Sequence, residues 1–347
     1  MTSATRPLVL SMGEPAGIGP ELTLMAWQRR HVRNLPAFAV LGDPQLLFDR
    51  SRRLGLDVPI GEIARLADAP AAFDAALPVL PLSASIAVAP GRPDPRAAPL
   101  VIEAIARAVD LCLAGDAAAL VTNPIAKSHL YQAGFRHPGH TEFLEALSVE
   151  RGRPARAVMM LAGRGLRTVP LTIHMPLKHV PGSITQSLIL DQARIVARDL
   201  AAYFHIGHPR LAVSGLNPHA GEDGAMGTEE RDIIAPALAI LRAEGLDVVG
   251  PLPADTMFHE EARATYDVAL CMYHDQALIP VKLLDFHEGV NCTLGLPFIR
   301  TSPDHGTAFS LAGTGRANPS SLIASIEMAA AMATAGASPG AGPAVAS

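Results

Sequence analysis

Three histidines stand where α/β proteins usually carry out chemistry. His174 lies in the segment LTIHMP, His219 in GLNPHAGEDG and His274 in ALCMYHDQALIP, and each follows an apolar, strand-like run. In open α/β sheets the loops at the carboxyl ends of strands converge to form the ligand site. Three imidazoles on three strand ends could hold one divalent metal ion and leave coordination positions for a substrate.

The residues by themselves leave a second interpretation open. The chain has 13 histidines, and a histidine beside a strand is most often a hydrogen-bonded core or surface residue. The spacing of the three also matches no compact ligand motif such as HExxH. The metal interpretation therefore depends on the equivalent contexts of the three histidines, and a purely structural role remains the alternative.

Composition favours a protein of helices packed on parallel sheets. Hydrophobic residues make up 49% of the 347 residues and aromatic residues only 4%, so Ala, Val, Leu and Ile must build the core. A chain of this length is expected to form two lobes. The net charge is -5, with acidic and basic residues interspersed. No basic block is present, which argues against nucleic-acid binding.

The cysteines and the termini indicate a reduced compartment. Cys112, Cys271 and Cys292 are widely separated and form no CxxC pair, and the last two lie in apolar runs typical of buried thiols. The N-terminal apolar stretch is too short for a secretory signal. No uncharged run approaches the ~18–20 apolar residues of a membrane span. We therefore expect a cytoplasmic protein without membrane contact.

Strand-like and helical segments alternate along the chain, which predicts the α/β class. Expected strands include 7–13, 37–43 and 118–124. Expected helices include one beginning near Gly19, one from about Pro99 to Leu113 with Gly115 as its stop, one capped by Ser183, one capped by Thr228 and a last one over 320–336. The Ala- and Pro-rich segment 62–95 has no clear assignment.

Two polar clusters could serve a site or only the fold. PGHTEF places His140 and Thr141 on a turn that opens a helix, where Thr141 is a candidate cap and His140 is expected to point outward. Lys282 lies in the apolar run IPVKLLDF. Such a lysine either extends its amine to solvent or serves a site, because an unpaired buried ammonium is costly.

Three further polar residues could likewise serve either a site or only the fold. Asn291 and Arg300 lie in an apolar strand pair, and arginine is a natural clamp for a carboxylate or phosphate. Asp255 follows a Pro-rich turn, where it is either a helix cap or a site acid.

Two glycine-rich segments are candidates for anion or nucleotide binding. GEPAGIGPE (13–21) lies between a strand and a helix, but it is neither GxGxxG nor a P-loop. HGTAFSLAGTGRANP (305–319) combines small residues, Asn and Arg before the last helix. This composition suits a backbone that a nucleotide approaches closely.

The motif series resembles that of a known family. GEPAGIGPE, PGHTEF, GLNPHAGEDGAMGTEE, GPLPADTMF, MYHDQ and GVNCTLGLPFIRTSPDHGTA, in this order from about Val9 to Met328, are similar to the motifs of the 4-hydroxythreonine-4-phosphate dehydrogenase (PdxA) family of pyridoxal phosphate biosynthesis. Segment 305–319 is also similar to the nucleotide-binding loop of isocitrate and isopropylmalate dehydrogenases. The resemblance implies their fold: two α/β/α lobes with the site in the cleft between them, rather than a GxGxxG Rossmann fold.

The resemblance also implies lobe boundaries and site residues. It implies a nucleotide-side lobe of 1–133 plus 296–336, a lobe of 134–295 for metal, substrate and dimerisation, and a disordered tail of 337–347. The implied roles are metal ligation by His174, His219 and His274; substrate binding by His140, Thr141, Lys282, Asn291 and Arg300; catalysis by Lys282 and Asp255; and cofactor binding by Gly313, Gly315 and Asn318.

The implied enzyme is a homodimer with its active site at the subunit interface. Each site holds one divalent ion (Zn, Mg, Mn or Co), with one ligand from one subunit and two from the other. NAD or NADP would oxidise 4-phosphooxy-L-threonine to 2-amino-3-oxo-4-phosphooxybutanoate, which loses CO₂ to give 3-amino-2-oxopropyl phosphate. The alternatives are dehydrogenation of a related 4-phosphorylated hydroxy acid or a dihydrodiol dicarboxylate and, from another class, a phosphate acyltransferase.

Overall fold

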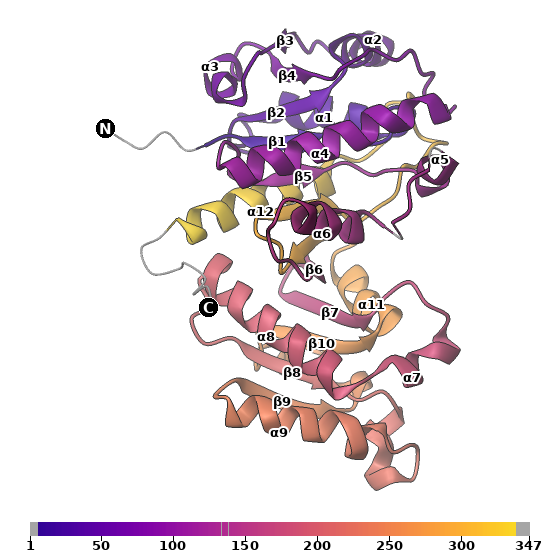
Figure 1. Cartoon of the computed structure of the whole chain (residues 1–347), viewed down its shortest axis with the longest axis vertical. Coiled ribbons are helices and arrows are strands. Elements are labelled where there is room, and N and C mark those ends of the chain that lie inside the picture. The colour runs from indigo at the N-terminus through magenta and orange to yellow at the C-terminus, as the bar shows by residue number, and fades with distance from the viewer. Residues whose placement is uncertain (1–5, 133, 138, 338–347) are drawn as a thin grey trace. The chain divides into compact units, whose positions relative to one another are not determined.

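The computed structural model describes residues 6–132, 134–137 and 139–337, which divide into two compact units (Figure 1). Unit 1 comprises Met1–Ala157 and Leu296–Ala333, and unit 2 comprises Val158–Gly295 and Thr334–Ser347. Each unit contains a sheet with helices packed against it, which confirms the predicted α/β class.

The strands of unit 1 pair in parallel throughout. Their order is β3 (Ile60–Glu62), β4 (Leu77–Pro81), β2 (Phe38–Gly42), β1 (Leu8–Ser11), β5 (Leu120–Thr122) and β12 (Arg300–Pro303). Every residue of β1, β2 and β5 is buried. Strands buried on both faces are continuous apolar runs, which is why these three could be predicted from the sequence.

The helices of unit 1 cover this sheet. The longer ones are α1 (Gly19–Gln28), α2 (Pro44–Leu54), α4 (Ala98–Ala114), α6 (His140–Glu150) and most of α12 (Ser320–Gly336); α3 (Ala69–Ala72) and α5 (Lys127–Gln132) are short. In Figure 1, α4 lies along β1, β2 and β5. It ends at Gly115, whose φ of 80° gives the left-handed conformation of a glycine stop, as predicted.

The expected lobe boundary at 133/134 differs from the division between the units, whereas the one at 295/296 coincides with it. Segment 134–157 contains α6, and α6 packs into the core of unit 1. Phe143, Leu144 and Leu147 of α6 join one hydrophobic cluster with residues of α4 such as Leu100 and Val101. Burial of this apolar face places the segment with unit 1. The predicted tail lies outside the described residues except for Ala337.

Unit 2 combines antiparallel and parallel pairing. Its strand order is β11 (Val290–Leu294), β6 (Val158–Gly163), β7 (Leu166–Thr172), β10 (Val268–Tyr273), β8 (Arg210–Ser214) and β9 (Asp247–Leu252). β6 is antiparallel to both β11 and β7. The pairs β7–β10, β10–β8 and β8–β9 are parallel, so the carboxyl ends of these four strands share one edge.

The helices of unit 2 follow its parallel strands. They are α7 (Val180–Ser183), α8 (Gln186–Tyr203), α9 (Ala235–Ala243), α10 (Glu260–Arg263) and α11 (His274–Leu284). α8 and α9 lie side by side (Figure 1). No helix of the described residues is both long and apolar enough to cross a bilayer.

One of the two predicted caps was wrong by two residues. Thr185, not Ser183, caps α8, because its Oγ1 accepts a hydrogen bond from the backbone N–H of Leu188 at 3.1 Å. The hydroxyl of Ser183 instead donates to the carbonyl of His179 at 2.9 Å. The helical backbone that runs through the π-helical turn η5 (Glu230–Ile234) into α9 begins at Glu229, with φ of -59° and ψ of -35°, so Thr228 directly precedes this helix, as predicted.

Candidate active site

The three candidate metal ligands leave three neighbouring parallel strands. His174 follows β7, His274 follows β10 directly, and His219 follows β8, with β10 lying between the other two. The prediction of a strand before each histidine is therefore confirmed, although residues 215–218 separate His219 from the end of β8. Because the carboxyl ends of parallel strands share an edge, all three residues originate on the same edge of unit 2.

His174 and His274 lie together in one cavity. Their ring centroids are 5.8 Å apart, which is roughly the separation of two imidazoles that bind one ion through bonds of about 2.0–2.1 Å. The cavity has a volume of about 370 Å³, and Thr172, Met175, Leu177 and Tyr273 are among its other lining residues. Two nitrogen donors in an open cavity fit a divalent ion that must also accept a substrate.

A carboxylate orients the ring of His274. Its Nδ1 lies 2.7 Å from Oδ1 of Asp275. Because an ionised carboxylate only accepts hydrogen bonds, Nδ1 carries the proton and donates it. The lone pair of Nε2 is then left for a metal, in the carboxylate–histidine–metal arrangement found at many such sites.

His219 does not line this cavity. Within the described ranges, no three His, Cys, Asp or Glu side chains lie close enough together to hold a metal ion. His219 is exposed and belongs to the short helical segment η4 (Pro218–Gly224), where its φ is 53°. One chain thus brings together two of the three predicted ligands.

Gln276, to which the sequence prediction gave no role, ties the strand ends together. Its Oε1 accepts from the Met272 N–H at 2.7 Å and from the Ser214 hydroxyl at 2.8 Å. Its Nε2 donates to the carbonyl of Gly215 at 2.9 Å. Gln276 thereby joins the end of β10, which precedes His274, to the end of β8. Its position in the motif MYHDQ was the sequence feature that could have indicated a role for it.

Three further predicted residues of unit 2 occupy different elements. Lys282 lies on α11, the helix that His274 begins, and its Nζ is 5.8 Å from the ring centroid of Phe286. Asn291 lies on β11, and its buried Oδ1 has no hydrogen-bond partner among the described residues. Asp255 is exposed on η6 (Ala254–Thr256), which contacts η4. Lys282 is thus linked to His274, and Asp255 to the segment of His219.

In unit 1, His140 does not point outward as expected. It begins α6, its Nε2 is buried, and this atom has no hydrogen-bond partner among the described residues. Burial, followed by the positive charges of Arg300 and Lys127, holds the pKa of His140 well below its usual value. The imidazole is therefore neutral at pH 7. The N-cap of α6 is Gly139, so Thr141 is not the cap.

Arg300 is an internal cation whose side chain is fixed at the sheet. The residue is 3% exposed, and its Nε and Nη2 donate to Oγ1 of Thr122 at 3.1 and 2.6 Å. Arg300 opens β12 beside β5, which ends at Thr122. Lys127, which the sequence prediction missed, adds a second cation near His140. This cluster suits an anionic group such as a phosphate or carboxylate.

A second polar group at the ends of β1 and β5 was also missed. Glu14 is buried, and burial raises its pKa despite a hydrogen bond from the Ala16 N–H and the nearby charge of His129. Asn123 Oδ1 and His129 Nδ1 are buried without hydrogen-bond partners among the described residues. Buried polar atoms are normally paired, so these two remain available to a ligand. Glu14 lies in the GEPAGIGPE motif, which was the signal for it.

The predicted cofactor loop packs against the other glycine-rich segment. Glu21 is fully buried and accepts a hydrogen bond from the N–H of Gly313 at 2.7 Å. Arg50 lies 3.6 Å from the same carboxylate and donates to the carbonyls of Pro15 and Gly17 at 2.9 Å. This buried pair therefore holds segments 13–21 and 305–319 in one arrangement.

The three predicted cofactor residues differ in how open they are to a ligand. A Cβ at Gly313 would lie 2.7 Å from Cβ of Pro90, so close packing and a φ of 72° explain that glycine. Asn318 Oδ1 accepts from the N–H of Ser320, at the start of α12, at 3.0 Å. A Cβ at Gly315 would meet only Leu54, at 3.8 Å, although φ is 74°. The backbone at Gly315 is thus open to a ligand.

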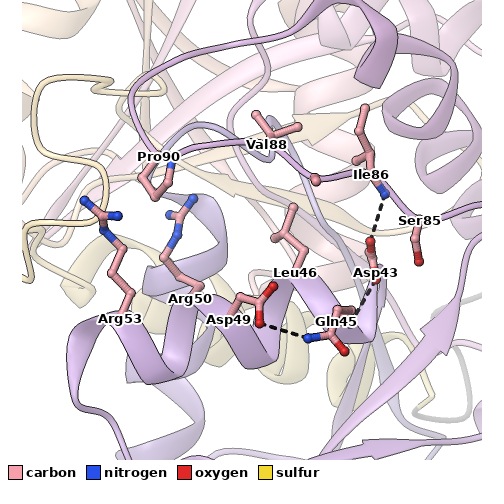
Figure 2. Close-up of a pocket in the computed structure, with 11 residues that line it drawn as sticks. Asp43, Gln45, Leu46, Asp49, Arg50, Arg53, Ser85, Ile86, Val88 and Pro90 are labelled. Carbon is pink, nitrogen blue, oxygen red and sulfur yellow. Dashed lines mark hydrogen bonds between the residues drawn. The ribbon is translucent and has the colours of Figure 1, made fainter.

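A cavity of about 290 Å³ adjoins this loop, between α2 and segment 85–90 (Figure 2). Figure 2 shows Arg50 and Arg53 side by side below Pro90. Nε of Arg53 is 3.4 Å from the carbonyl oxygen of Gly313, whereas the guanidinium of Arg50 is bound internally. Asp43 is also used internally, because it accepts from the backbone N–H groups of Gln45 and Ile86. Arg53 is the exposed cation of this cavity.

Comparisons with known proteins agree with the resemblance. Residues 34–329 match the family described as "Pyridoxal phosphate biosynthetic protein PdxA". 4-Hydroxythreonine-4-phosphate dehydrogenase of Methylorubrum extorquens is 58% identical over 332 residues, which cover 95% of each chain. The crystal structure of 4-hydroxythreonine-4-phosphate dehydrogenase from Klebsiella pneumoniae is 38% identical with a TM-score of 0.84, covering 94% of this chain and 99% of that one.

A structure with a different substrate in its name is less similar. A terephthalate 1,2-cis-dihydrodiol dehydrogenase from Burkholderia xenovorans is 26% identical, with a TM-score of 0.64 over 94% of this chain and 98% of that one. The comparisons thus favour the threonine-phosphate dehydrogenases over the dihydrodiol dehydrogenases. With 296 matched positions, from 34 to 329, out of 347, the chain belongs to the PdxA family.

Proposed function

We propose that the chain oxidises 4-phosphooxy-L-threonine with NAD or NADP in pyridoxal phosphate biosynthesis. The product, 2-amino-3-oxo-4-phosphooxybutanoate, is a β-keto acid and loses CO₂ to give 3-amino-2-oxopropyl phosphate. Relatives that bear this enzyme name and are more than half identical over nearly the whole chain support the proposal. The structural observation that carries it is the pair His174 and His274 at adjacent strand ends, with Asp275 orienting the second ring.

His174, His219 and His274 would hold one divalent metal ion. When bound, such an ion lowers the pKa of the substrate hydroxyl and so favours loss of its proton as hydride leaves for the nicotinamide. Asp275 fixes the tautomer of His274, and Gln276 fixes the strand end before it. These residues set the donor geometry before any ligand binds.

A second copy of the chain would complete this site. The third ligand, His219, lies outside the cavity that holds the other two. Large apolar side chains are also exposed in unit 2: Leu177 beside His174, and Ile279, Leu283 and Phe286 on or just after α11, with exposures from 64% to 84%. Exposed apolar side chains of this size are typical of protein interfaces. We therefore propose a homodimer in which His219 comes from the other subunit.

We assign Lys282 and Asp255 to one or the other subunit from the helix or turn on which each residue lies. Lys282 lies on the helix that starts at His274, so it belongs to the subunit that supplies His174 and His274. Asp255 lies on η6, which contacts the segment of His219, so it comes with the other subunit. Lys282 and Asp255 are our candidates for proton transfer and substrate positioning, and Asn291 offers an acceptor oxygen that no described residue pairs.

The cluster in unit 1 would bind the anionic groups of the substrate. Arg300 is held by Thr122, Lys127 adds charge, and the neutral His140 can donate or accept a hydrogen bond. Thr141 follows His140 at the start of α6, where backbone N–H groups also favour anions. We assign the phosphate to this cluster because two cations lie close to one imidazole.

The cofactor would bind at segment 305–319. The open backbone at Gly315 admits close approach, and Asn318 lies three residues further along. The cavity beside Gly313 has an exposed guanidinium, that of Arg53, at its edge. Arg53 is the candidate to bind a cofactor phosphate and thus to distinguish NADP from NAD.

The direct test is reduction of NAD⁺ by dialysed protein with 4-phosphooxy-L-threonine, with and without added divalent metal. We expect NADH formation that requires metal and stops with chelator. If neither NADH nor NADPH forms when metal and the matching dinucleotide are present, this compound is excluded as the substrate. The same assay with 4-phosphorylated hydroxy acids lacking the amine would then test the alternative substrates.

Complementation tests the shared site. His219→Ala and His274→Ala should each be inactive and folded. Mixing them after subunit exchange should restore about a quarter of wild-type activity, because half of the dimers are mixed and each mixed dimer has one complete site. Asp255→Ala should complement His274→Ala but not His219→Ala. No recovery in the His219→Ala and His274→Ala mixture would contradict the assignment of His219 to the other subunit.

A further inference from the structure

The segment that carries His219 is a left-handed turn. His219, Ala220, Gly221, Glu222 and Asp223 have φ values of 53°, 52°, 82°, 40° and 52° in succession. Only one of the five is glycine, and a left-handed backbone costs free energy at every other residue because Cβ crowds the following carbonyl. Such a run persists only where the surrounding structure compensates for it. The contacts of the turn should therefore show what stabilises it.

The compensating contacts converge on one carboxylate, that of Glu230. Its Oε1 accepts hydrogen bonds from the backbone N–H groups of Leu216 and Asn217, both at 2.7 Å. Its Oε2 accepts from Nδ2 of Asn217 at 3.0 Å. Glu230 is only 5% exposed, so these bonds are shielded from water. The side chain thus fixes the chain just before His219.

The far side of the turn packs directly on the same carboxylate. A Cβ at Gly221 would lie 2.6 Å from Oε2 of Glu230, and a Cβ at Gly215 would lie 3.0 Å from its Oε1. The two glycines therefore allow the backbone to close around the carboxylate. The N–H of Ala220 donates to the carbonyl of Asn217 at 3.1 Å, which closes the turn itself.

Glu230 is ionised in this setting. Burial acts to raise its pKa, but the hydrogen bonds from Asn217 and Leu216 together lower it below its usual value. Charge-assisted hydrogen bonds to backbone N–H groups are stronger than neutral ones. A charged acceptor at the centre of the turn can therefore offset a strained backbone.

We propose that Glu230 is a positioning residue for the metal site: its carboxylate stabilises the left-handed turn that presents His219 to the ion. The proposal rests on the proposed metal-binding function. It assigns a role to Glu230 that differs from ligation, because the residue bonds the segment before His219 and faces its backbone. Loss of a group that orients a ligand typically weakens metal affinity about 10–100-fold.

The test is titration of the metal-free protein with Co²⁺, followed by calorimetry and by the absorption spectrum of the bound ion. Glu230→Gln keeps the size of the side chain but places an amide NH₂ against Nδ2 of Asn217. We expect Co²⁺ to bind this variant about 10–100-fold more weakly. Amide hydrogen exchange at Leu216 and Asn217 should be faster even without metal. Glu222→Gln is the matched control, since it removes an exposed carboxylate from the same turn and should behave as wild type.

Asn217→Ala is the milder second variant, because it removes one of the three hydrogen bonds to Glu230, together with the bond from Nδ2 to Oε2 of Glu229 at 2.7 Å, and leaves the charge of Glu230. It should weaken Co²⁺ binding by less than Glu230→Gln does. Wild-type Co²⁺ affinity in Glu230→Gln would overturn the positioning role while leaving the metal site intact. Wild-type protein that binds no Co²⁺ at all would instead overturn the proposed metal function, and the positioning role with it.

Discussion

Nδ1 of His274 lies 2.7 Å from Oδ1 of Asp275, the next residue in the chain. The two residues begin α11 directly after β10, so the strand end, the helix start and the ring orientation are set together. A ligand oriented in this way loses little conformational freedom when it binds an ion.

Asp275→Asn should weaken binding of Co²⁺ about 10–100-fold, because the amide can donate as well as accept and no longer fixes the tautomer of His274. Calorimetric titration of the metal-free protein measures the effect. His259 and Glu261 provide a matched control, since Nδ1 of His259 also lies 2.7 Å from a carboxylate oxygen, on a different element. If Glu261→Gln weakened binding as much as Asp275→Asn, the effect would not be due to ligand orientation.

Thr122→Val should raise KM for the phosphorylated substrate more than it lowers kcat. The substitution removes the hydroxyl that accepts two hydrogen bonds from Arg300, so the guanidinium loses its fixed position. Loss of these bonds should also lower the free energy of unfolding by about 1–3 kcal/mol. Steady-state kinetics and urea unfolding measure the two effects.

Thr301→Val separates stability from substrate binding. The hydroxyl of Thr301 is buried in β12. It donates a hydrogen bond to the carbonyl of Ser325 at 2.8 Å, and this bond does not involve Arg300. We expect this variant to lose stability and to keep its KM. An equal rise of KM in both variants would exclude Thr122 as the residue that positions Arg300.

His140 should make the folded protein less stable as the pH falls. Its pKa in the folded state lies well below the value of 6.5 that applies when it is exposed, because burial and then the charges of Arg300 and Lys127 disfavour the cation. Below pH ~6.5 the unfolded chain therefore binds a proton that the folded chain does not, which favours unfolding. His140→Gln should lose less stability than wild type between pH 7 and 5.5, by up to ~1.4 kcal/mol per pH unit.

Urea unfolding of both proteins at the two pH values tests this difference. His31→Gln, which replaces an exposed histidine, is the control for the loss of an imidazole. The same pH dependence in His140→Gln and wild type would mean that His140 takes up its proton in the folded state.

The strand ends of the site were predictable, whereas the local geometry was not. Apolar runs before His174, His219 and His274 indicated β7, β8 and β10, because buried parallel strands leave a clear pattern. The helix α11 after His274 was missed, since Pro280 lies inside it and a proline normally ends a helix. The left-handed turn at His219 was missed because four of its five residues are not glycine, and the sign of φ at such residues depends on tertiary contacts.

Burial also escaped prediction where it depends on distant segments. His140 was expected to point outward from its turn, but α6 packs against α4, and Arg300 approaches from a strand more than 150 residues away in the sequence. Glu21 and Arg50 likewise form their buried pair across two helices. No local pattern encodes such pairs. The motifs GEPAGIGPE and MYHDQ marked the segments of Glu14 and Gln276, but the contacts of these residues could be recognised only in the fold, as could the approach of Lys127 to His140.

Arg53→Ala should weaken binding of NADP more than that of NAD. Its guanidinium lies at the edge of the cavity beside Gly313 and donates to the carbonyl oxygen of Gly313 at 3.4 Å, so it is placed to bind a phosphate (Figure 2). We expect KM for NADP to rise about tenfold, which corresponds to about 1.4 kcal/mol, and KM for NAD to rise less. Calorimetry with 2′,5′-ADP and 5′-AMP gives the same comparison without turnover. Arg52→Ala is the control, because Arg52 is a neighbour that is also exposed and does not line the cavity. If 2′,5′-ADP bound Arg53→Ala and Arg52→Ala equally well, the cofactor phosphate would have to lie elsewhere along segment 305–319.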